Sequence, residues 1–542
     1  MKKRLENKAV LIIIILLLFH AVINFYVLDK STFLRKADDA SRVSESLRFH
    51  QRLMSRKYKN LAKDFYILPL PSHPKFYPLT AGLVMTFLDK VGLKDINWMI
   101  LTTNAFFLFI LLISVFKIGA LLYDEKIGLL AVILLSFSLA IFSHSRISML
   151  DFPLTAMLSL CFLSLLKTRN LSSLSFSLFT GVLFGLTQLT KETAVIFILP
   201  VFLYYSFHSL HIVKEKRKKK IINFIIVLLL FLIVAGMVYL NPSNKEMFRT
   251  YWGKSFLINN SSSYDMFYYI ESLPLLSIGI IFSAVLFPLF LSYVYNIRKG
   301  NLFLTFWFFV PILIFSISSN KTSRFIMPAL PPLFLLLSSE LFNPVFLKIR
   351  KIYGTILISS SFLQYTAFNF FPQLTSCPSP SEARLLYDYD FQLGLLSVRH
   401  DEDFYLVGEM VDLFKKQKTI PGKEDKIILF TFTSGIFIPL EHEFTKTGMS
   451  FFVSCPQTRD PIDAPAPGTV DWKRYLLTAD YVVHKTGDMG KVGHLEDISG
   501  AFKKSLEENA QFFEEIARFK KSNGDSIFVY KNLKKIDDFV GI

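Results

Sequence analysis

The sequence predicts an α-helical polytopic membrane protein that ends in a water-soluble α/β domain. Of its 542 residues, 52% are hydrophobic and only 19% are charged. Apolar runs close to the length that crosses a hydrocarbon core of ~30 Å recur through residues 1–372. From residue 373 onward, charged residues and Gly, Pro and Asp turns become frequent. We therefore expect a membrane domain over 1–372 and a soluble domain over 373–542.

Eleven apolar runs are expected to span the membrane. The first begins near residue 9 and is about 20 residues long, longer than the core of a signal peptide, and no small-residue cleavage site follows it. We therefore expect it to be retained, with the N-terminus inside, so that an odd number of spans places residues 373–542 outside. The predicted spans are 9–28, 97–120, 127–144, 151–167, 173–188, 193–213, 221–240, 275–295, 301–318, 325–341 and 354–372.

The net charge of +17 does not indicate nucleic-acid binding. Most of the basic residues lie in segments predicted to be cytoplasmic, as the positive-inside rule requires. The basic run at 214–220 is expected to fix the topology or to contact lipid headgroups. These patterns predict a multi-pass protein of the cytoplasmic membrane.

The C-terminal segment alternates strand-like and helical patterns. Strands are expected at 426–432, 481–484 and 526–530, and a helix over 501–519. Cys377 and Cys455 both fall in this predicted outer domain, where a disulfide is able to persist, and the pattern leaves open whether they pair. Cys161 lies within an apolar span.

Acidic and basic residues gather in the segments predicted to face outward. The long first loop, 29–96, carries the adjacent acids Asp38 and Asp39. It also holds an amphipathic segment at 76–88 that is too short to span the membrane and is expected to lie on its surface. Asp151 lies in the next, very short outer segment. Cations follow in the other outer segments at Lys191, Arg249, Lys321 and Arg324.

These residue types suit the transfer of a sugar from a lipid phosphate to a hydroxyl group. A carboxylate within hydrogen-bond reach takes the proton of the hydroxyl. Lysine and arginine stabilise the departing phosphate. A lipid-linked donor requires a site at the membrane face, which is where the outer segments lie.

The order of the motifs resembles the GT-C superfamily of polyprenyl-phosphate-sugar-dependent glycosyltransferases. The similarity is strongest to family 39 and the branch with protein O-mannosyltransferases and lipid A aminoarabinose transferases. The matching segments are Asp38-Asp39, Ser72-His-Pro-Lys-Phe-Tyr-Pro78, Ser145-Arg-Ile-Ser-Met-Leu-Asp-Phe-Pro153, the Lys-Glu-Thr of 191–193, the Lys-x2-Arg-Phe-Ile-Met-Pro of 321–328 and Asn523-Gly-Asp525. Two positions depart from the family pattern: Asp39 stands where Glu is common, and Lys75 replaces a proline.

The resemblance implies an inverting transfer on the outer face from a polyprenyl-phosphate-linked sugar to a protein, lipid or glycan acceptor. Asp38 is the preferred base, with Asp39 as its rival and Asp151 as the second acid of the site. An optional divalent cation, Mg or Mn, is implied at Asp38 and Asp151. The implied donor-phosphate residues are Lys75, Lys191, Arg249, Lys321 and Arg324, and the implied substrate-binding residues are His73, Tyr77, Arg146 and Glu192.

Two other classes of function compete with this interpretation. A transporter or flippase of lipid-linked or other small solutes is expected to carry ionisable or broken positions near the centres of its spans. Here the charges cluster at the outward ends. A non-catalytic membrane scaffold leaves the clustered acids unexplained. The sequence therefore favours the glycosyltransferase.

Overall fold

The computed structural model describes most of the chain up to residue 370 and parts of the chain beyond it. The described residues are 2–30, 37–68, 73–93, 95–212, 216–245, 267–296, 301–318, 321–370, 409–410, 412–414, 416–417, 425–430, 451–454, 476, 479–485, 503–520 and 526–533. The chain divides into two compact units. The first comprises Met1–Lys30, Glu45–Leu93 and Asn97–Val398, and the second comprises Ser31–Ser44, Lys94–Ile96 and Arg399–Ile542.

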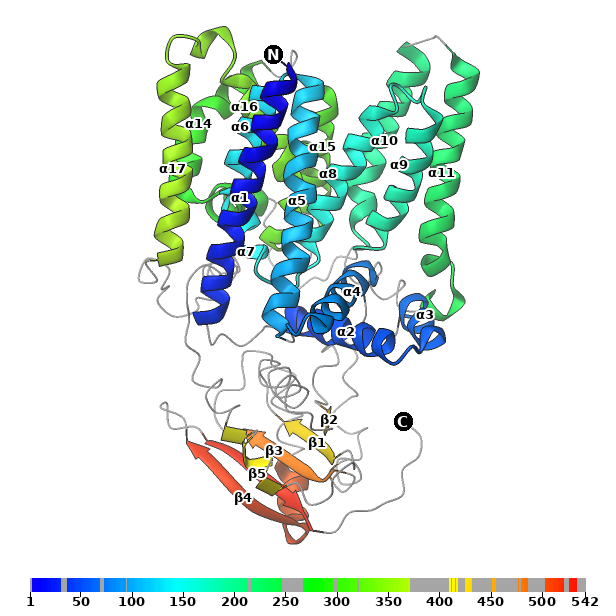
Figure 1. Ribbon diagram of the computed structural model, residues 1–542, viewed down its shortest axis with the longest axis vertical. Coiled ribbons are helices and arrows are strands. Elements are labelled where there is room, and N and C mark those ends of the chain that lie inside the picture. Colours follow the sequence, from blue (N-terminus) through cyan, green and yellow to red (C-terminus); the bar gives the residue numbers. More distant parts are fainter. Residues whose placement is uncertain are drawn as a thin grey trace. The chain divides into compact units, whose positions relative to one another are not determined.

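Helices make up most of the described chain from residue 2 to residue 370, and all but the start of α2 and the first residue of α5 belong to the first unit (Figure 1). They are α1 (Lys2–Lys30), α2 (Ala37–Met54), α3 (Tyr58–Tyr66), α4 (Phe76–Lys90), α5 (Ile96–Leu122), α6 (Glu125–Ser136), α7 (Leu139–His144), α8 (Asp151–Lys167), α9 (Leu174–Gln188), α10 (Ala194–Phe207), α11 (Arg217–Tyr239), α13 (Tyr268–Ser272), α14 (Ile280–Tyr295), α15 (Leu302–Ile317), α16 (Leu330–Glu340) and α17 (Arg350–Phe370). Shorter π or 3-10 segments are η1 (His208–Ile212), η2 (Pro242–Asn244), η3 (Leu273–Ile278), η5 (Ser323–Ala329) and η6 (Pro344–Phe346).

Four described helices are long and apolar enough to cross a membrane: Asn7–Leu28, Ile96–Leu122, Ala194–His211 and Arg217–Tyr239. A fifth is added if the bent pair Tyr268–Ile278 and Ile280–Tyr295 counts as one span. The predicted spans at 9–28, 97–120, 193–213 and 221–240 are therefore confirmed as helices of membrane-crossing length. The other predicted spans hold shorter or less apolar helices, and the count of eleven stays a prediction.

Three predicted spans are broken rather than continuous. The span at 127–144 divides into α6 and α7, and the one at 325–341 divides into η5 and α16. Pro331 and Pro332 do not kink a helix, because they lie in the first turn of α16, where the missing N–H groups cost nothing. The span at 275–295 bends by 118° at Gly279, whose φ of 99° is a conformation that favours glycine.

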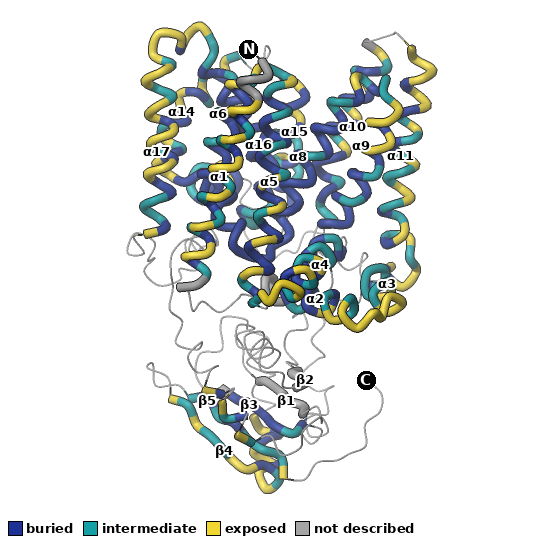
Figure 2. Tube along the Cα trace, in the orientation of Figure 1, coloured by how far each residue is buried: buried dark blue, intermediate teal, exposed yellow. Residues whose placement is uncertain are grey.

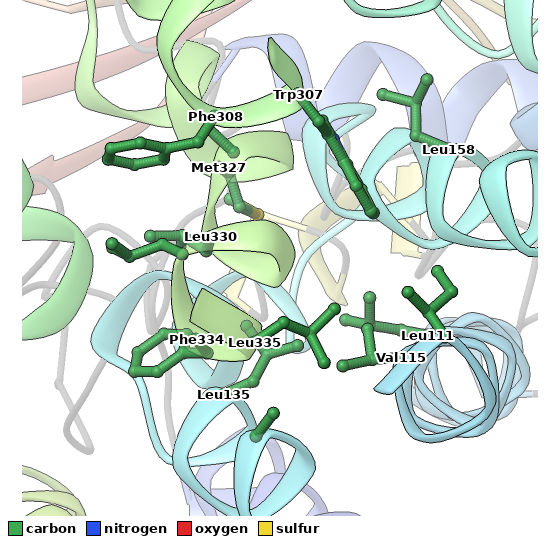
Figure 3. Packing of buried hydrophobic residues seen from close by; sticks show 14 of the residues in the cluster. Leu111, Val115, Leu135, Leu158, Trp307, Phe308, Met327, Leu330, Phe334 and Leu335 are labelled. Carbon is green, nitrogen blue, oxygen red and sulfur yellow. The ribbon is translucent and has the colours of Figure 1, made fainter. Parts of the chain in front are cut away.

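The core of the first unit is apolar and lies around α8. Nearly every residue of this helix from Asp151 to Leu165 is buried, and α8 packs against α9, α10 and η5 (Figure 2). Trp307 of α15 and Leu158 of α8 lie in the same cluster as Leu111 of α5 and Leu335 of α16 (Figure 3). Asp151 is the first residue of this helix, and its side chain is buried inside the bundle.

The segment at 76–88 forms the helix α4, which packs closely on α2, and its expected position on the membrane surface stays a prediction. Its buried residues, including Tyr77, Ala81 and Met85, lie on one face. A side chain at Gly82 would come within 2.7 Å of Phe49 Cβ, so only glycine allows this approach. The packing holds the segment that precedes α4 next to α2.

The second unit contains a five-stranded mixed sheet in the order β2-β1-β3-β5-β4 (Figure 1). Its strands are β1 (Asp425–Phe430), β2 (Phe451–Ser454), β3 (Tyr481–Lys485), β4 (Phe513–Lys520) and β5 (Ser526–Asn532). β1 pairs in parallel with β2 and β3, whereas β5 pairs antiparallel with β3 and β4.

The three predicted strands of this unit are confirmed, but the helix predicted over 501–519 is wrong in its second half. Residues 513–520 form β4, whose pairing with β5 outweighs the helical pattern. The predicted partners Cys377 and Cys455 lie outside the described residues. The domain boundary at 372/373 stays a prediction.

Candidate active site

A buried ion pair joins two of the predicted site residues. Lys191 Nζ donates to Asp151 Oδ1 at 2.6 Å, and the two residues are 5% and 2% exposed. Asp151 begins α8, and Lys191 lies in the turn between α9 and α10. The packing of α8 against α9 brings together residues that are forty positions apart in the sequence.

A second cation approaches the other oxygen of the same carboxylate. Arg324 Nε lies 3.8 Å from Asp151 Oδ2, and Arg324 Nη1 lies 3.1 Å from Met149 Sδ. Phe325 lies beside both cations, with Lys191 Nζ 4.6 Å from the centre of its ring. Asp151, Lys191 and Arg324 are named the Asp151 cluster below.

The Asp151 cluster combines one buried carboxylate with a buried cation, Lys191, and a partly exposed one, Arg324. Because Asp151 directs one oxygen to each cation, its geometry suits holding Lys191 and Arg324 in position. Two fixed cations at the end of a buried helix suit the binding of a phosphate, whose charge they balance. Lys321, another predicted phosphate residue, is buried just before η5.

His73 and Glu192, both predicted to bind substrate, contact each other. His73 Nδ1 lies 3.0 Å from both carboxylate oxygens of Glu192. Burial raises the pKa of Glu192, but the charge and hydrogen bond of His73 and the charge of Lys191 outweigh it and lower that pKa to about 2. Glu192 therefore stays ionised throughout the physiological pH range.

Lys75 pairs with an acid that the sequence analysis did not single out. Its ammonium group forms an ion pair with the carboxylate of Glu45 on α2, and Lys75 is buried. Lys75 immediately precedes α4, so the close packing of α4 on α2 creates this pair.

Arg146 and Tyr77 have surroundings that differ from those expected of substrate ligands. Arg146 is only 1% exposed, and it donates to the side-chain oxygens of Asn24 and Asn369. Tyr77 is fully buried and donates to Asn104 Oδ1 at 3.1 Å. These contacts indicate that both side chains hold the interior of the bundle together.

The three asparagines were missed by the sequence analysis. Asn104 donates to the carbonyls of Ser145 and Ile147, and so fixes the loop that leads to Asp151. Asn24 and Asn104 each lie within a long apolar run. A polar residue in such a run commonly has a specific partner, and this signal was present in the sequence.

The acid pair predicted to supply the base lies at the start of a helix. Asp38 and Asp39 are in the first turn of α2, and their side chains lie outside what the structure describes. Arg249 also lies outside the described residues. The predicted roles of these three residues therefore stay predictions.

The divalent cation implied at Asp38 and Asp151 stays a prediction, because the side chain of Asp38 lies outside the described residues. Among them, no group of three or more His, Cys, Asp or Glu is placed to hold a metal ion. Both oxygens of Asp151 face cations, which would repel a further one. We assign no chemistry to a metal.

Part of the chain matches a known family. Residues 72–239 match the model of the dolichyl-phosphate-mannose-protein mannosyltransferases. This segment includes His73, Lys75, Asp151, Lys191 and Glu192, and so most of the described site. No curated protein matches the chain.

Solved structures extend the similarity to nearly the whole chain. ArnT from Cupriavidus metallidurans bound to undecaprenyl phosphate is 13% identical, with a TM-score of 0.59 over 95% of this chain and 97% of ArnT. The oligosaccharyltransferase AglB from Archaeoglobus fulgidus, in complex with an inhibitory peptide and a dolichol-phosphate, is 10% identical. Its TM-score is 0.52 over 95% of this chain and 74% of AglB. At these identities the likeness shows the fold, and at the level of the fold the predicted resemblance is confirmed: the chain shares the fold of ArnT and AglB.

Proposed function

We propose that this protein transfers a sugar from a polyprenyl-phosphate donor to a hydroxyl group of an acceptor, with inversion at the anomeric carbon. The Asp151 cluster is the observation that carries the proposal. It places two cations, held by one buried carboxylate, in a fold shared with proteins solved with undecaprenyl phosphate or dolichol-phosphate. The donor supplies the anion that such a cluster suits.

The reaction needs one base and one site for the departing phosphate. A carboxylate of Asp38 or Asp39, with Asp38 preferred, takes the proton of the acceptor hydroxyl. The hydroxyl oxygen then attacks the anomeric carbon on the face opposite the phosphate. The bond between that carbon and the phosphate oxygen breaks, and polyprenyl phosphate leaves with the electron pair.

Lys191 and Arg324 stabilise the charge that develops on the departing phosphate. Asp151 keeps both cations fixed before the donor arrives, so little reorganisation is needed during the reaction. Lys75, Lys321 and Arg249 are further candidates for contacts with the donor phosphate.

We place the reaction on the outer face of the cytoplasmic membrane, with the N-terminus inside and residues 373–542 outside. The positive-inside pattern of the basic segments supports this orientation. A reporter enzyme that works only outside the cytoplasm, fused after Ile542, is expected to be active. Activity of a cytoplasmic reporter at the same position would contradict the orientation.

Transfer by the purified protein tests the proposed function. The protein in lipid nanodiscs is incubated with a panel of polyprenyl-phosphate sugars and with protein, lipid and glycan acceptors. We expect one donor to yield polyprenyl phosphate and an acceptor whose mass increases by one sugar residue. Failure of every donor with every acceptor class, in protein shown to be folded, would refute the proposal.

A further inference from the structure

A side-chain amide is inserted into the break between η3 and α14. In a continuous α-helix, the N–H of Phe282 would donate to the backbone oxygen of Ile278, four residues earlier. Here Gln364 of α17 replaces that bond with two others. Its Nε2 donates to the backbone oxygen of Ile278 at 2.8 Å, and its Oε1 accepts from the N–H of Phe282 at 3.2 Å. Gln364 is completely buried, so both hydrogen bonds form away from water.

Gln364 and Gly279 hold the bend together. A buried backbone group without a partner is costly, so without the amide the N–H of Phe282 and the oxygen of Ile278 gain most by bonding to each other. That bond would straighten the helix. A side chain at Gly279 would place its Cβ 2.1 Å from Gln364 Nε2, so the amide fits only because residue 279 is glycine. The bend of 118° therefore depends on this pair.

The segment before the break reaches the segment that carries Arg324. Residues Tyr268–Ile278, named the bent limb below, comprise α13 and η3. The bent limb packs against α7 and η5, and Arg324 is the second residue of η5. η3 is a π-helix, a rare conformation that is frequent at functional sites.

Three aromatic rings connect the bent limb with the Asp151 cluster. The centre of the Tyr269 ring in α13 lies 6.4 Å from that of Phe315 in α15, which lies 5.7 Å from that of Phe325 in η5. Phe325 in turn lies beside both cations, with its ring centre 4.6 Å from Lys191 Nζ and 5.8 Å from Arg324 Cζ. Rings packed at these distances transmit a displacement, because a packed interior has little free space.

We propose that Gln364 is a positioning residue for the donor phosphate. Its amide keeps the limb bent, and the bent limb keeps Phe325, Lys191 and Arg324 in the arrangement that receives the phosphate. Gln364 acts through these residues and touches no substrate. The inference rests on the proposed function, since it concerns the phosphate site of the same reaction.

The variant Q364M keeps the length of the side chain and removes both hydrogen bonds. We expect the KM for the polyprenyl-phosphate donor to rise about fivefold in nanodiscs, less than the effect of removing a cation of the cluster. The KM for the acceptor should be unchanged and kcat should fall less than about twofold, because the amide acts on the donor site alone. A donor KM equal to that of the wild type in folded Q364M would overturn the proposal.

A double-mutant cycle with R324A distinguishes positioning from a general structural defect. Because Gln364 acts on the donor largely through Arg324, we expect Q364M to raise the donor KM less than about twofold once Arg324 is removed. An increase of the same size in both backgrounds would overturn the proposal, since the two residues would then act independently.

G279A reaches the same break from the other side and leaves Gln364 in the sequence. Its new methyl group would displace the amide, so we expect the same rise in donor KM as for Q364M. A wild-type donor KM in folded G279A would contradict the proposal even if Q364M failed to fold.

Asn223 supplies a matched control. This buried residue of α11 also donates from a side-chain amide to a backbone oxygen, that of Leu171, at 2.7 Å. Leu171 lies beyond the end of α8 that is opposite Asp151. We expect N223L to lower the unfolding temperature without altering the donor KM. If N223L raised the donor KM as much as Q364M, the loss of any buried amide would be enough, and the proposal would fail.

Hydrogen exchange separates this proposal from the proposed function. In Q364M, the backbone amides of 273–278 and 323–329 are expected to exchange about tenfold faster than in the wild type, and those of 168–173 at the wild-type rate. Unchanged exchange at 323–329 would show that the bend does not hold η5, whether or not the protein transfers sugar. The expected exchange, with no transfer by the wild type, would refute the proposed function alone.

Discussion

Arg146 and Asp151 are charged residues of the same buried segment, yet their surroundings are opposite. Arg146 donates to the neutral side chains of Asn24 of α1 and Asn369 of α17, the first and last described helices of the unit. Asp151 faces the cations Lys191 and Arg324. The amides hold the side chain of Arg146 in place and carry no charge of their own. The Asp151 cluster has two positive charges and one negative charge, so a net positive charge is left to bind an anionic ligand. Within one motif, Arg146 therefore has a structural role and Asp151 belongs to a binding site.

The largest effect is expected from removing the charge of Asp151. D151N leaves the buried Lys191 and the partly exposed Arg324 without their shared carboxylate, and breaking the buried Asp151–Lys191 pair costs about 3–5 kcal/mol of the free energy of unfolding. We expect sugar transfer to fall to background. The measurements are transfer in nanodiscs and chemical unfolding in detergent.

The double variant D151N/K191M sharpens this result. It removes the buried pair as a whole, so we expect it to regain part of the stability and none of the transfer. Sugar transfer by D151N at the wild-type rate would show that Asp151, like Arg146, has a structural role and does not belong to the active site.

A smaller effect is expected from Arg324, whose ion pair with Asp151 is longer than that of Lys191. R324A is expected to raise the KM for the polyprenyl-phosphate donor by about tenfold, which corresponds to about 1.4 kcal/mol of lost binding. R324K restores the positive charge but not the planar guanidinium group with its paired N–H donors, and should recover only part of the affinity for the donor. Steady-state kinetics at varied donor concentration measures this KM. A donor KM equal to that of the wild type would exclude a contact between Arg324 and the donor phosphate.

Arg146 is expected to respond in stability rather than in chemistry. R146M removes the donors to Asn24 and Asn369, and we expect a loss of about 1–3 kcal/mol in the free energy of unfolding. Transfer by the folded fraction should fall less than tenfold. Chemical unfolding and transfer are measured on the same preparation. Normal stability with abolished transfer would instead support the substrate-binding role that the sequence predicted.

The smallest effect is expected at the end of that network. N369A removes one acceptor of Arg146 and should cost about 1 kcal/mol. Combined with R146M, it is expected to cost little more than R146M alone, because both variants break the same bond. Additive losses in unfolding would show that Asn369 stabilises the bundle by other contacts.

The sequence predicted what depends on local pattern. Long apolar runs gave the helices α1, α5, α10 and α11, and the motif order brought Asp151, Lys191 and Arg324 into one hypothesis. The sequence analysis missed contacts between side chains that are far apart in the sequence. Glu45, the partner of Lys75, gives no signal of its own before α4 packs on α2.

Local pattern also failed where tertiary contacts decide the structure. A helix was predicted through residue 519, but pairing with β5 makes residues 513–520 a strand. The break at Gly279 is held by Gln364 of α17, which donates to the backbone oxygen of Ile278 at 2.8 Å. A contact across eighty-six residues leaves no trace in hydropathy.

The most direct test of the account is sugar transfer by the wild type, D38N and D39N with the donor that the panel selects. We expect the wild type to release polyprenyl phosphate and glycosylate the acceptor. D38N is expected to lose transfer while keeping its membrane level and unfolding temperature. Wild-type transfer by both variants would contradict the account, because the acceptor hydroxyl would then have lost its proton to neither of the proposed bases.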